Sequence, residues 1–444
     1  MIPQVQRETS DSTISNVPHW SLATKIGFRF TFSYLLLYIG PGAVGSLPSY
    51  LTPEQLEVKF GSRIWHPIVP WVGAHILGLS GNFTEVPNGS GDELYSYVLV
   101  FCLFLVAVLV TAIWSALDRG RPNYKHLYQW LRVFMRLVAA WAMLAYGAKK
   151  LVGSQFTPPD LLRLVQPIGQ ASPMGMLWTF MGASALYSFF GGFGETLGGV
   201  LLLFPRLTTL GALVSGAMMT NVMMLNLCYD VPRKIFSIHL VLMCLFLLIP
   251  DFRRLANVLV LNRPADPVPV EPLFDDKVLN RIALVAQVVF GAWVLWIASA
   301  QSIKDKRDIV ATWPAPIRGV WTVNGFTEDG IIRPPLLTDS ERWRNIVLDS
   351  PKLMTAIDMS GNRTRYYVEM DGSQHTAKVW ELGDPHRNGV ITLQFPNPNQ
   401  MTFDGQLDGH QISAKMDRVD MADPEKYPLM NKGLHWVNPF IDNR

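Results

Sequence analysis

The sequence contains seven apolar runs, each close to the roughly 20 residues that a helix needs to cross a bilayer. They lie at 26–46, 94–117, 128–146, 177–204, 207–227, 234–249 and 281–303. Only 16% of the 444 residues are charged, whereas soluble domains average about 25%. We therefore expect a membrane α-helical protein with about seven spans.

The order of these runs predicts five segments. We expect an N-terminal segment at 1–25, two spans with a long outer loop at 26–125, a four-helix core at 126–262, a linker and last span at 263–304, and a separate domain at 305–444. Paired prolines and a short LLRLV stripe in 147–176 predict an interfacial segment folded back over the bundle.

The last segment differs in composition from the rest of the chain. It contains short alternating runs at 319–326, 364–370, 377–382, 389–395, 401–407 and 410–416, separated by Gly, Asn, Asp and Pro. Such spacing is typical of an antiparallel sheet. We expect a small β-barrel or sandwich whose aromatic residues form its core rather than a ligand site, and we interpret Asp408-Gly409-His410 as a hairpin turn.

The placement of Lys and Arg predicts the orientation. With a cytoplasmic N-terminus, the inner segments carry more Lys and Arg than the outer loops, as the positive-inside rule requires. Seven spans then place the C-terminal β domain outside the cytoplasm. We expect a multi-pass protein of a bacterial inner membrane with its β domain in the periplasm.

The glycine-rich stretch GGFGETLGGVLLLFPR places a single carboxylate, Glu195, inside an apolar run. Arg136 lies eleven residues past Lys125 and Glu195 lies eleven before Arg206, so both are predicted to lie about 16 Å from the inner boundary. A charge in hydrocarbon requires a partner. We therefore predict an Arg136–Glu195 ion pair.

By the same measure of depth, Asn221, Thr220 and His239 would join this pair in one polar layer. One interpretation is a pocket that binds a head group, a quinone carbonyl or a proton. The alternative is a buried ion pair that fixes helix register, with His239 as a hydrogen-bonded core residue. Tyr146 and Tyr187 either lie at the membrane interface or reach the pocket, and their spacing in the sequence fits either position. The three cysteines (Cys102, Cys228 and Cys244) form no Cys-x-x-Cys and are interpreted as core residues.

At these residues the chain resembles a known family. LRVFMRLVAAWAMLAYGAKKL at 131–151, followed by GETLGGVLLLFPRLTTLGAL at 194–213, resembles the DoxX family of small bacterial membrane proteins. The resemblance covers about 126–262. It implies a four-helix core and the shared positions Arg136, Gly147, Lys150, Glu195, Gly198 and Gly199.

The remainder is similar to a longer bacterial subset of that family, with two extra N-terminal spans, a last span and a β domain ending in a motif like LHWVNPF at 434–440. The resemblance implies a link to membrane redox chemistry. The sequence has no Cys pair, no Gly-rich nucleotide loop and no set of haem or iron–sulfur ligands. Electron transfer would therefore require a bound quinone or a redox partner subunit.

Three functions remain open at this point. The first is a quinone-linked oxidoreductase component in which Glu195 is the proton acceptor or hydrogen-bond partner, tuned by Arg136 and His239. The second is a non-enzymatic anchor or scaffold whose β domain binds a periplasmic protein or lipid. The third is transport of a small solute or lipid through the polar layer. No Lys/Arg block resembles a nucleic-acid patch.

Overall fold

The computed structural model describes residues 19–40, 54–80, 91–267, 271–371, 376–423 and 426–431. The chain divides into two compact units, one made of 1–140, 201–227 and 232–289, the other of 141–200, 228–231 and 290–444. Three long helices, α4 (Lys125–Val152), α7 (Ala185–Leu203) and α11 (Lys277–Val310), contribute residues to both units.

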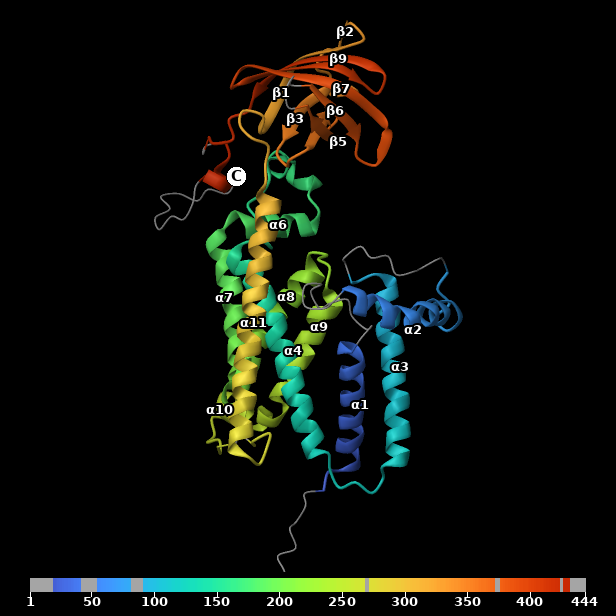
Figure 1. Ribbon diagram of the computed structural model, residues 1–444, viewed down its shortest axis with the longest axis vertical. Coiled ribbons are helices and arrows are strands. Elements are labelled where there is room, and N and C mark those ends of the chain that lie inside the picture. Colours follow the sequence, from blue (N-terminus) through green and yellow to red (C-terminus); the bar gives the residue numbers. More distant parts are fainter. Residues whose placement is uncertain are drawn as a thin grey trace, which may run out of the picture. The chain divides into compact units, whose positions relative to one another are not determined.

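The first unit is helical. Besides its parts of the shared helices it contains α1 (Leu22–Ile39), α2 (Glu54–His75), α3 (Leu94–Leu117), η2 (Pro205–Leu207), α8 (Thr208–Cys228), α9 (Lys234–Leu248), η3 (Ile249–Asp251) and α10 (Phe252–Leu259). Helices α1 and α3 run side by side, and α2 also packs against α3 (Figure 1). The carboxylate of Asp92 accepts bonds from the Lys234 and Ile235 amides, so it caps the N-terminus of α9.

The second unit combines helices with a sheet. Its helices are the end of α4, α5 (Leu161–Leu164), η1 (Ile168–Gln170), α6 (Pro173–Ala183), most of α7, the C-terminal part of α11, and α12 (Pro428–Asn431). Lys306 on α11 donates to the Val152 carbonyl at the end of α4, at 2.8 Å. This bond places a cation at the C-terminus of α4, where the helix dipole favours one.

Six helical stretches within the described residues are long and apolar enough to cross a membrane: Leu94–Leu117, Lys125–Val152, Ala185–Leu203, Pro205–Cys228, Lys234–Leu259 and Lys277–Val310. The protein is therefore membrane-associated. Each of these stretches overlaps one predicted span, and the run at 94–117 matches the bounds of α3. The first predicted span at 26–46 is described only up to residue 40, and its helix α1 is not among the six.

Two features differ from the expected spans. The predicted fourth span at 177–204 is broken, because Ser184 adopts extended backbone angles (φ −124°, ψ 98°) between α6 and α7. The second is α2, which the structure forms inside the region that we expected to be an outer loop. The polar residues of α2 and its Pro67 and Pro70 conceal it from a search for long apolar runs.

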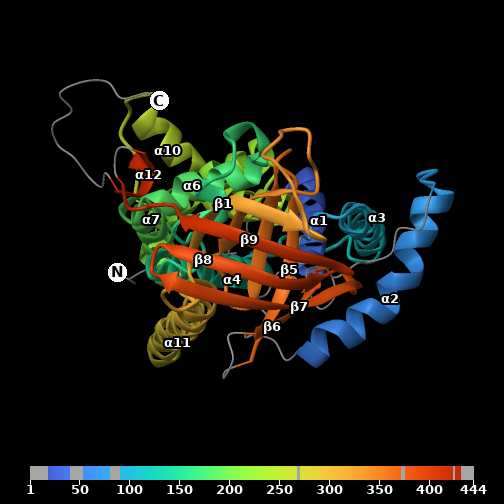
Figure 2. The same cartoon turned by 90° about the horizontal axis from the view of Figure 1, so that it is seen from above.

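The C-terminal part is a closed antiparallel β-barrel, one of the two architectures expected. Its strands are β1 (Gly319–Glu328), β2 (Ile331–Ile332), β3 (Trp343–Leu348), β4 (Leu353–Asp358), β5 (Arg363–Met370), β6 (Thr376–Glu381), β7 (Asp384–Asn397), β8 (Gln400–Leu407) and β9 (His410–Arg418). Each strand from β3 to β8 pairs with the next along the chain. β3 also pairs with β1, and β1 pairs with β9, which closes the sheet. The long strands β7, β8 and β9 lie next to one another (Figure 2). Closure removes the free edges at which open sheets associate.

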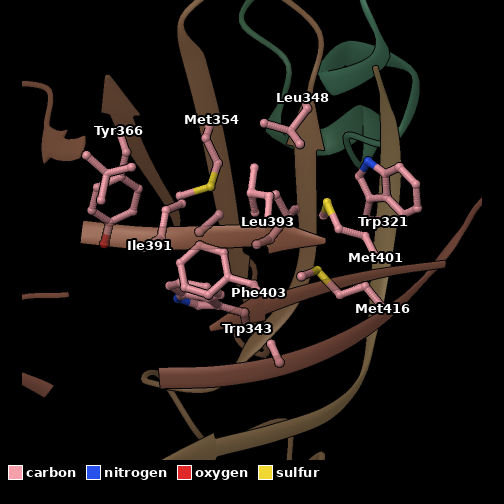
Figure 3. Packing of buried hydrophobic residues seen from close by; sticks show 14 of the residues in the cluster. Trp321, Trp343, Leu348, Met354, Tyr366, Ile391, Leu393, Met401, Phe403 and Met416 are labelled. Atoms are coloured by element: carbon pink, nitrogen blue, oxygen red, sulfur yellow. The ribbon is translucent and has the colours of Figure 1, made fainter. Parts of the chain in front are cut away.

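Side chains fill the interior of the barrel. Trp321 and Phe403 are fully buried, and both lie in one apolar cluster with Trp343, Met354 and Tyr366 (Figure 3). The expected core role is confirmed for Trp321, Trp343 and Tyr366, whereas Tyr367 and Trp380 are half-buried and pack on each other. Trp436 and the 434–440 motif lie outside the described residues, as do residues 1–18.

The predicted hairpin turn at Asp408-Gly409 is confirmed. Both residues have a positive φ (54° and 89°), and the flanking residues Leu407 and His410 are paired across β8 and β9. A positive φ at both central residues is typical of the type I′ turn. This turn matches the twist of the flanking strands and favours Asp-Gly. Asp329-Gly330 makes an equivalent turn between β1 and β2.

Candidate functional site

The candidate site begins where α4 and α7 approach closely. A Cβ atom added to Gly147 would lie 2.9 Å from the Thr196 backbone nitrogen, and one added to Gly192 would lie 2.8 Å from the Leu151 nitrogen. Real Cβ atoms do not approach backbone so closely, so both positions require glycine. The two glycines bring the backbones of the helices together, as small residues do in membrane bundles.

This contact aligns Lys150 on α4 with Glu195 on α7. The Lys150 Nζ atom lies 2.8 Å from each carboxylate oxygen of Glu195. The lysine side chain is 7% exposed and the glutamate 1%. A buried carboxylate and a buried ammonium each lose their hydration, and each would be strongly unfavourable without the other.

Aromatic rings surround the ammonium group. Nζ of Lys150 lies 5.9 Å from the ring centre of Tyr146 and 6.0 Å from that of Phe156. Trp178 packs edge-on against Phe156 at 5.1 Å. Cation–π attraction from these faces adds to the ion pair.

The arrangement limits what Glu195 can do chemically. Both oxygens accept hydrogen bonds from the same ammonium, so another ligand would reach this carboxylate only if Lys150 moved away. The geometry is that of a lock between α4 and α7. Within the part of the chain that the structure describes, two nearby polar atoms are buried without a hydrogen-bond partner, the Thr196 hydroxyl and the Gln155 side-chain oxygen.

The predicted pair of Arg136 and Glu195 is wrong. Lys150 occupies Glu195, while Arg136 donates to the Thr208 hydroxyl at 3.2 Å and to the Gln287 side-chain oxygen. Arg136 and Lys150 are on the same helix, about 21 Å apart along its axis at 1.5 Å per residue. The sequence places Arg136 and Glu195 at equal distances from the inner boundary. Equal depth does not determine which cation faces Glu195.

His239 belongs to a separate aromatic cluster. Its Nδ1 lies 2.7 Å from the Ile235 carbonyl oxygen, which can only accept, so we assign the proton to Nδ1. Its Nε2 lies 2.7 Å from the Tyr34 hydroxyl and therefore accepts from it in the neutral ring. The ring of Tyr38 stacks on the imidazole at 3.5 Å, and its buried hydroxyl has no partner among the described residues.

The remaining candidates do not complete one polar layer. Thr220 and Asn221 are exposed on α8, and the Thr220 hydroxyl bonds the Gly216 carbonyl of its own helix. Gly198 and Gly199 are buried. Tyr146 contacts the Lys150 ammonium, whereas Tyr187 is 47% exposed and packs on Phe180. The expected layer is thus replaced by local clusters, each with its own partners.

Sequence reasoning assigned no polar contact to several residues that matter here: Lys150, Tyr34, Tyr38, Thr208 and Gln287. Lys150 was expected only as a position that the resemblance to the DoxX family implies. Gly147 lies one helical turn before Lys150 on α4. This spacing could have indicated a contact between Lys150 and α7, because a glycine at 147 lets α7 approach. No pattern in the sequence distinguishes the other four from ordinary core residues.

Comparison with known proteins adds one relative. The chain is 37% identical over 144 residues to the uncharacterized protein YwoB of Bacillus subtilis (strain 168). The alignment covers 32% of this chain and 90% of YwoB. The chain belongs to the YwoB family. The aligned length corresponds to about a third of the present chain, so most of the chain lies outside its likeness to YwoB. No family model and no solved structure matches the chain.

Proposed function

We propose that this YwoB-family protein is a membrane anchor that holds its β-barrel in a fixed orientation for binding a periplasmic protein or lipid. The observation that carries the proposal is the joint between residues 160–165 and the barrel. The Leu161 amide donates to the Asp349 carboxylate at 2.7 Å, and Asp349 also accepts from Arg318 at 2.9 Å. A flexible tether would need no such bonds.

Apolar packing extends this joint. Three side chains of the 160–165 segment (Leu161, Leu162 and Val165) pack against a cluster on the outside of the barrel, made of Val320, Val347 and Ile357 with Val419 and Met421. We expected this segment to lie at the membrane interface, and its apolar stripe instead covers part of the barrel. Complete burial of an aliphatic side chain contributes roughly 1.5–3 kcal/mol. Leu161, Leu162 and Val165 are half-buried, so each stabilises the contact by less than this.

Two further observations support binding rather than catalysis. The barrel interior is filled by its own side chains, which argues for recognition on the outer surface. Glu195 is neutralised by Lys150, which suits a structural lock better than a proton acceptor. We retain the DoxX-like four-helix core, the inner-membrane location and the periplasmic barrel as parts of the proposal, supported by sequence resemblance and by the placement of Lys and Arg.

Site-specific photocrosslinking in intact cells tests the anchor proposal. A photoreactive residue would replace Val390 or Leu382, which are both 55% exposed on the barrel, and Phe403 in the core would provide the silent control. We expect a defined crosslinked protein or lipid from the surface positions, and a weaker crosslink when Asp349→Ala loosens the joint. Absence of any specific crosslink from probes spread around the barrel would contradict the proposal.

The Tyr34–His239 bond favours a second candidate, a quinone-linked oxidoreductase component. A phenol that donates to an imidazole inside an apolar bundle can exchange a proton with a bound quinone. We would extract the purified protein with solvent and measure quinones by mass spectrometry, with wild type beside Tyr34→Phe, His239→Gln and Glu195→Gln. A stoichiometric quinone lost in the first two variants would support redox function. An equal absence of quinone in all four proteins would exclude it.

A further inference from the structure

Arg136 has no counter-ion in the part of the chain that the structure describes. Its side chain is 4% exposed, and both of its partners, the Thr208 hydroxyl and the Gln287 amide, are neutral. Its Nε atom is buried and has no hydrogen-bond acceptor among the residues that the structure describes. An arginine keeps its charge in proteins, so this unit contains a buried positive charge that neutral groups only partly solvate.

A second arginine lies one helical turn away on α4. Arg132 donates to the Leu247 carbonyl at 3.4 Å and lies over the Tyr128 ring, and its Nε is likewise buried without a partner among the described residues. Residues four apart on a helix share a face, so the two guanidinium groups carry like charges on one side of α4. This repulsion adds to the cost of burying Arg136.

The nearby groups do not compensate for this charge. Asp251 is buried at the end of η3, but its carboxylate accepts from Thr209 at 2.5 Å and pairs with Arg254 at 3.5 Å. Thr208 is the first residue of α8, a helix of 21 residues whose positive dipole end therefore lies beside Arg136. The Gln287 amide donates to the Ala283 carbonyl at 2.9 Å, which leaves only its oxygen for Arg136.

We propose that Arg132 and Arg136 together bind a phosphate group, which supplies the counter-charge that Arg136 lacks among the described residues. Two guanidinium groups with free N–H donors beside a helix N-terminus match the chemistry of phosphate recognition. Arg132 is half-buried, so part of its side chain is accessible to a ligand. The phosphate can come from an anionic phospholipid head group or from free phosphate. This site is independent of the barrel and of the anchor proposal.

Thermal melting and native mass spectrometry of the detergent-purified full chain test the site. The probes are short-chain phosphatidylglycerol, phosphatidylcholine of the same chain length, and inorganic phosphate. We expect phosphatidylglycerol to raise the melting temperature and to remain as a single adduct, with a much smaller effect of phosphatidylcholine. Stabilisation by phosphatidylglycerol alone identifies a lipid head group, and stabilisation by inorganic phosphate as well identifies a site for free phosphate.

Three variants make the test specific. Arg136→Gln should weaken phosphatidylglycerol binding about tenfold or more, because a charge-assisted contact is lost. Arg253→Gln removes an exposed arginine of α10 and should leave binding unchanged. Gln287→Glu places a carboxylate beside Arg136, and we expect it to abolish binding while raising the melting temperature of the ligand-free protein. This variant remains informative if Arg136→Gln does not fold.

Two results would overturn the proposal. One is equal binding of phosphatidylglycerol by wild type, Arg136→Gln and Gln287→Glu. The other is a wild-type protein whose melting temperature responds to neither phosphatidylglycerol nor phosphate and which keeps no phosphate-containing adduct. Either result would mean that the neutral partners of Arg136 suffice to stabilise its charge.

Discussion

Lys150 binds both carboxylate oxygens of Glu195 at 2.8 Å, and both side chains are buried. The bond joins the end of α4 to the middle of α7, across a contact that only glycines permit. The pair is therefore a structural unit, and its two halves should be energetically coupled.

The first prediction concerns this coupling. Glu195→Gln leaves the Lys150 ammonium buried without a counter-charge and should destabilise the protein by about 3–5 kcal/mol. The double variant Glu195→Gln/Lys150→Met removes both charges and should regain most of that loss. Thermal unfolding in detergent measures both variants, with Lys304→Gln, an exposed lysine of α11, as the control. Additive effects of Glu195→Gln and Lys150→Met would show that the pair is not coupled.

The second prediction compares two neighbouring glycines of α7. A Cβ at position 192 would lie 2.8 Å from both the Leu151 nitrogen and the Lys150 Cβ, whereas one at position 191 would lie 3.9 Å from the flexible Lys150 Cδ. Gly192→Ala should therefore destabilise the protein by about 1–3 kcal/mol. Gly191→Ala should be neutral or stabilising by up to about 1 kcal/mol, because alanine favours helix. Unfolding curves that do not distinguish the two variants would refute the close approach of α4 and α7.

The sequence predicted the place of Glu195 in a span but not its partner Lys150. The run of apolar residues around Glu195 predicted a span, and the glycines predicted a close helix contact. The partner could not be predicted, because the depth of a residue does not specify the rotation of its helix. A lysine near a helix end can extend to the boundary or turn inward along its flexible stem. In the structure Lys150 points inward and is buried against Glu195.

The strands of the barrel were also predicted only in part. Its six alternating runs were identified because one face of each strand is polar. Strands β3 and β4 were missed, and β4 is buried at five consecutive positions, so it shows no alternation. The reason is that Val347 and Ile357 lie under the 160–165 segment, which covers the outer face of the barrel there. A local pattern cannot indicate that a distant segment will cover a strand.

The third prediction concerns the joint between that segment and the barrel. Asp349→Ala removes the acceptor of both the Leu161 amide and Arg318, bonds of a type that contributes about 1.5–3 kcal/mol. We expect faster hydrogen exchange of the Leu161 amide and of α5, with the barrel strands unchanged. Asp420→Ala, which removes an exposed carboxylate that bonds the Ala422 amide, is the control. Unchanged exchange at Leu161 would show that apolar contacts alone maintain the joint.

The fourth prediction is a pH dependence at the β1–β2 turn. The Asp329 carboxylate lies 2.7 Å from Nδ1 of His410, and this hydrogen bond, together with the charge of Asp329, raises the pKa of His410 above its usual 6.5. The pKa of Asp329 is lowered in return, first by the bond with His410. The stabilisation from His410 is complete below about pH 6.5 and is lost as the pH rises through the raised pKa.

Histidine NMR titration measures this shift directly. Asp329→Asn should lower the pKa of His410, while Asp384→Asn, elsewhere on the barrel, should leave it unchanged. Because both side chains are solvent-exposed, we expect a clear titration shift and little change in melting temperature. A pKa of His410 that does not respond to Asp329→Asn would contradict the bond.

The closure of the barrel determines when it can form. Arg418 on β9 donates to the carbonyl of Arg318, a hundred residues earlier, and β1 and β9 pair along most of their length. During synthesis β1 therefore cannot pair with β9 until β9 has been made, and until then this edge of β1 is unpaired. Folding dominated by such distant pairings is slow and exposes the chain to aggregation. A chain truncated before residue 410 would lack the closing strand, so we expect premature termination or proteolysis there to leave an open sheet attached to an intact membrane bundle.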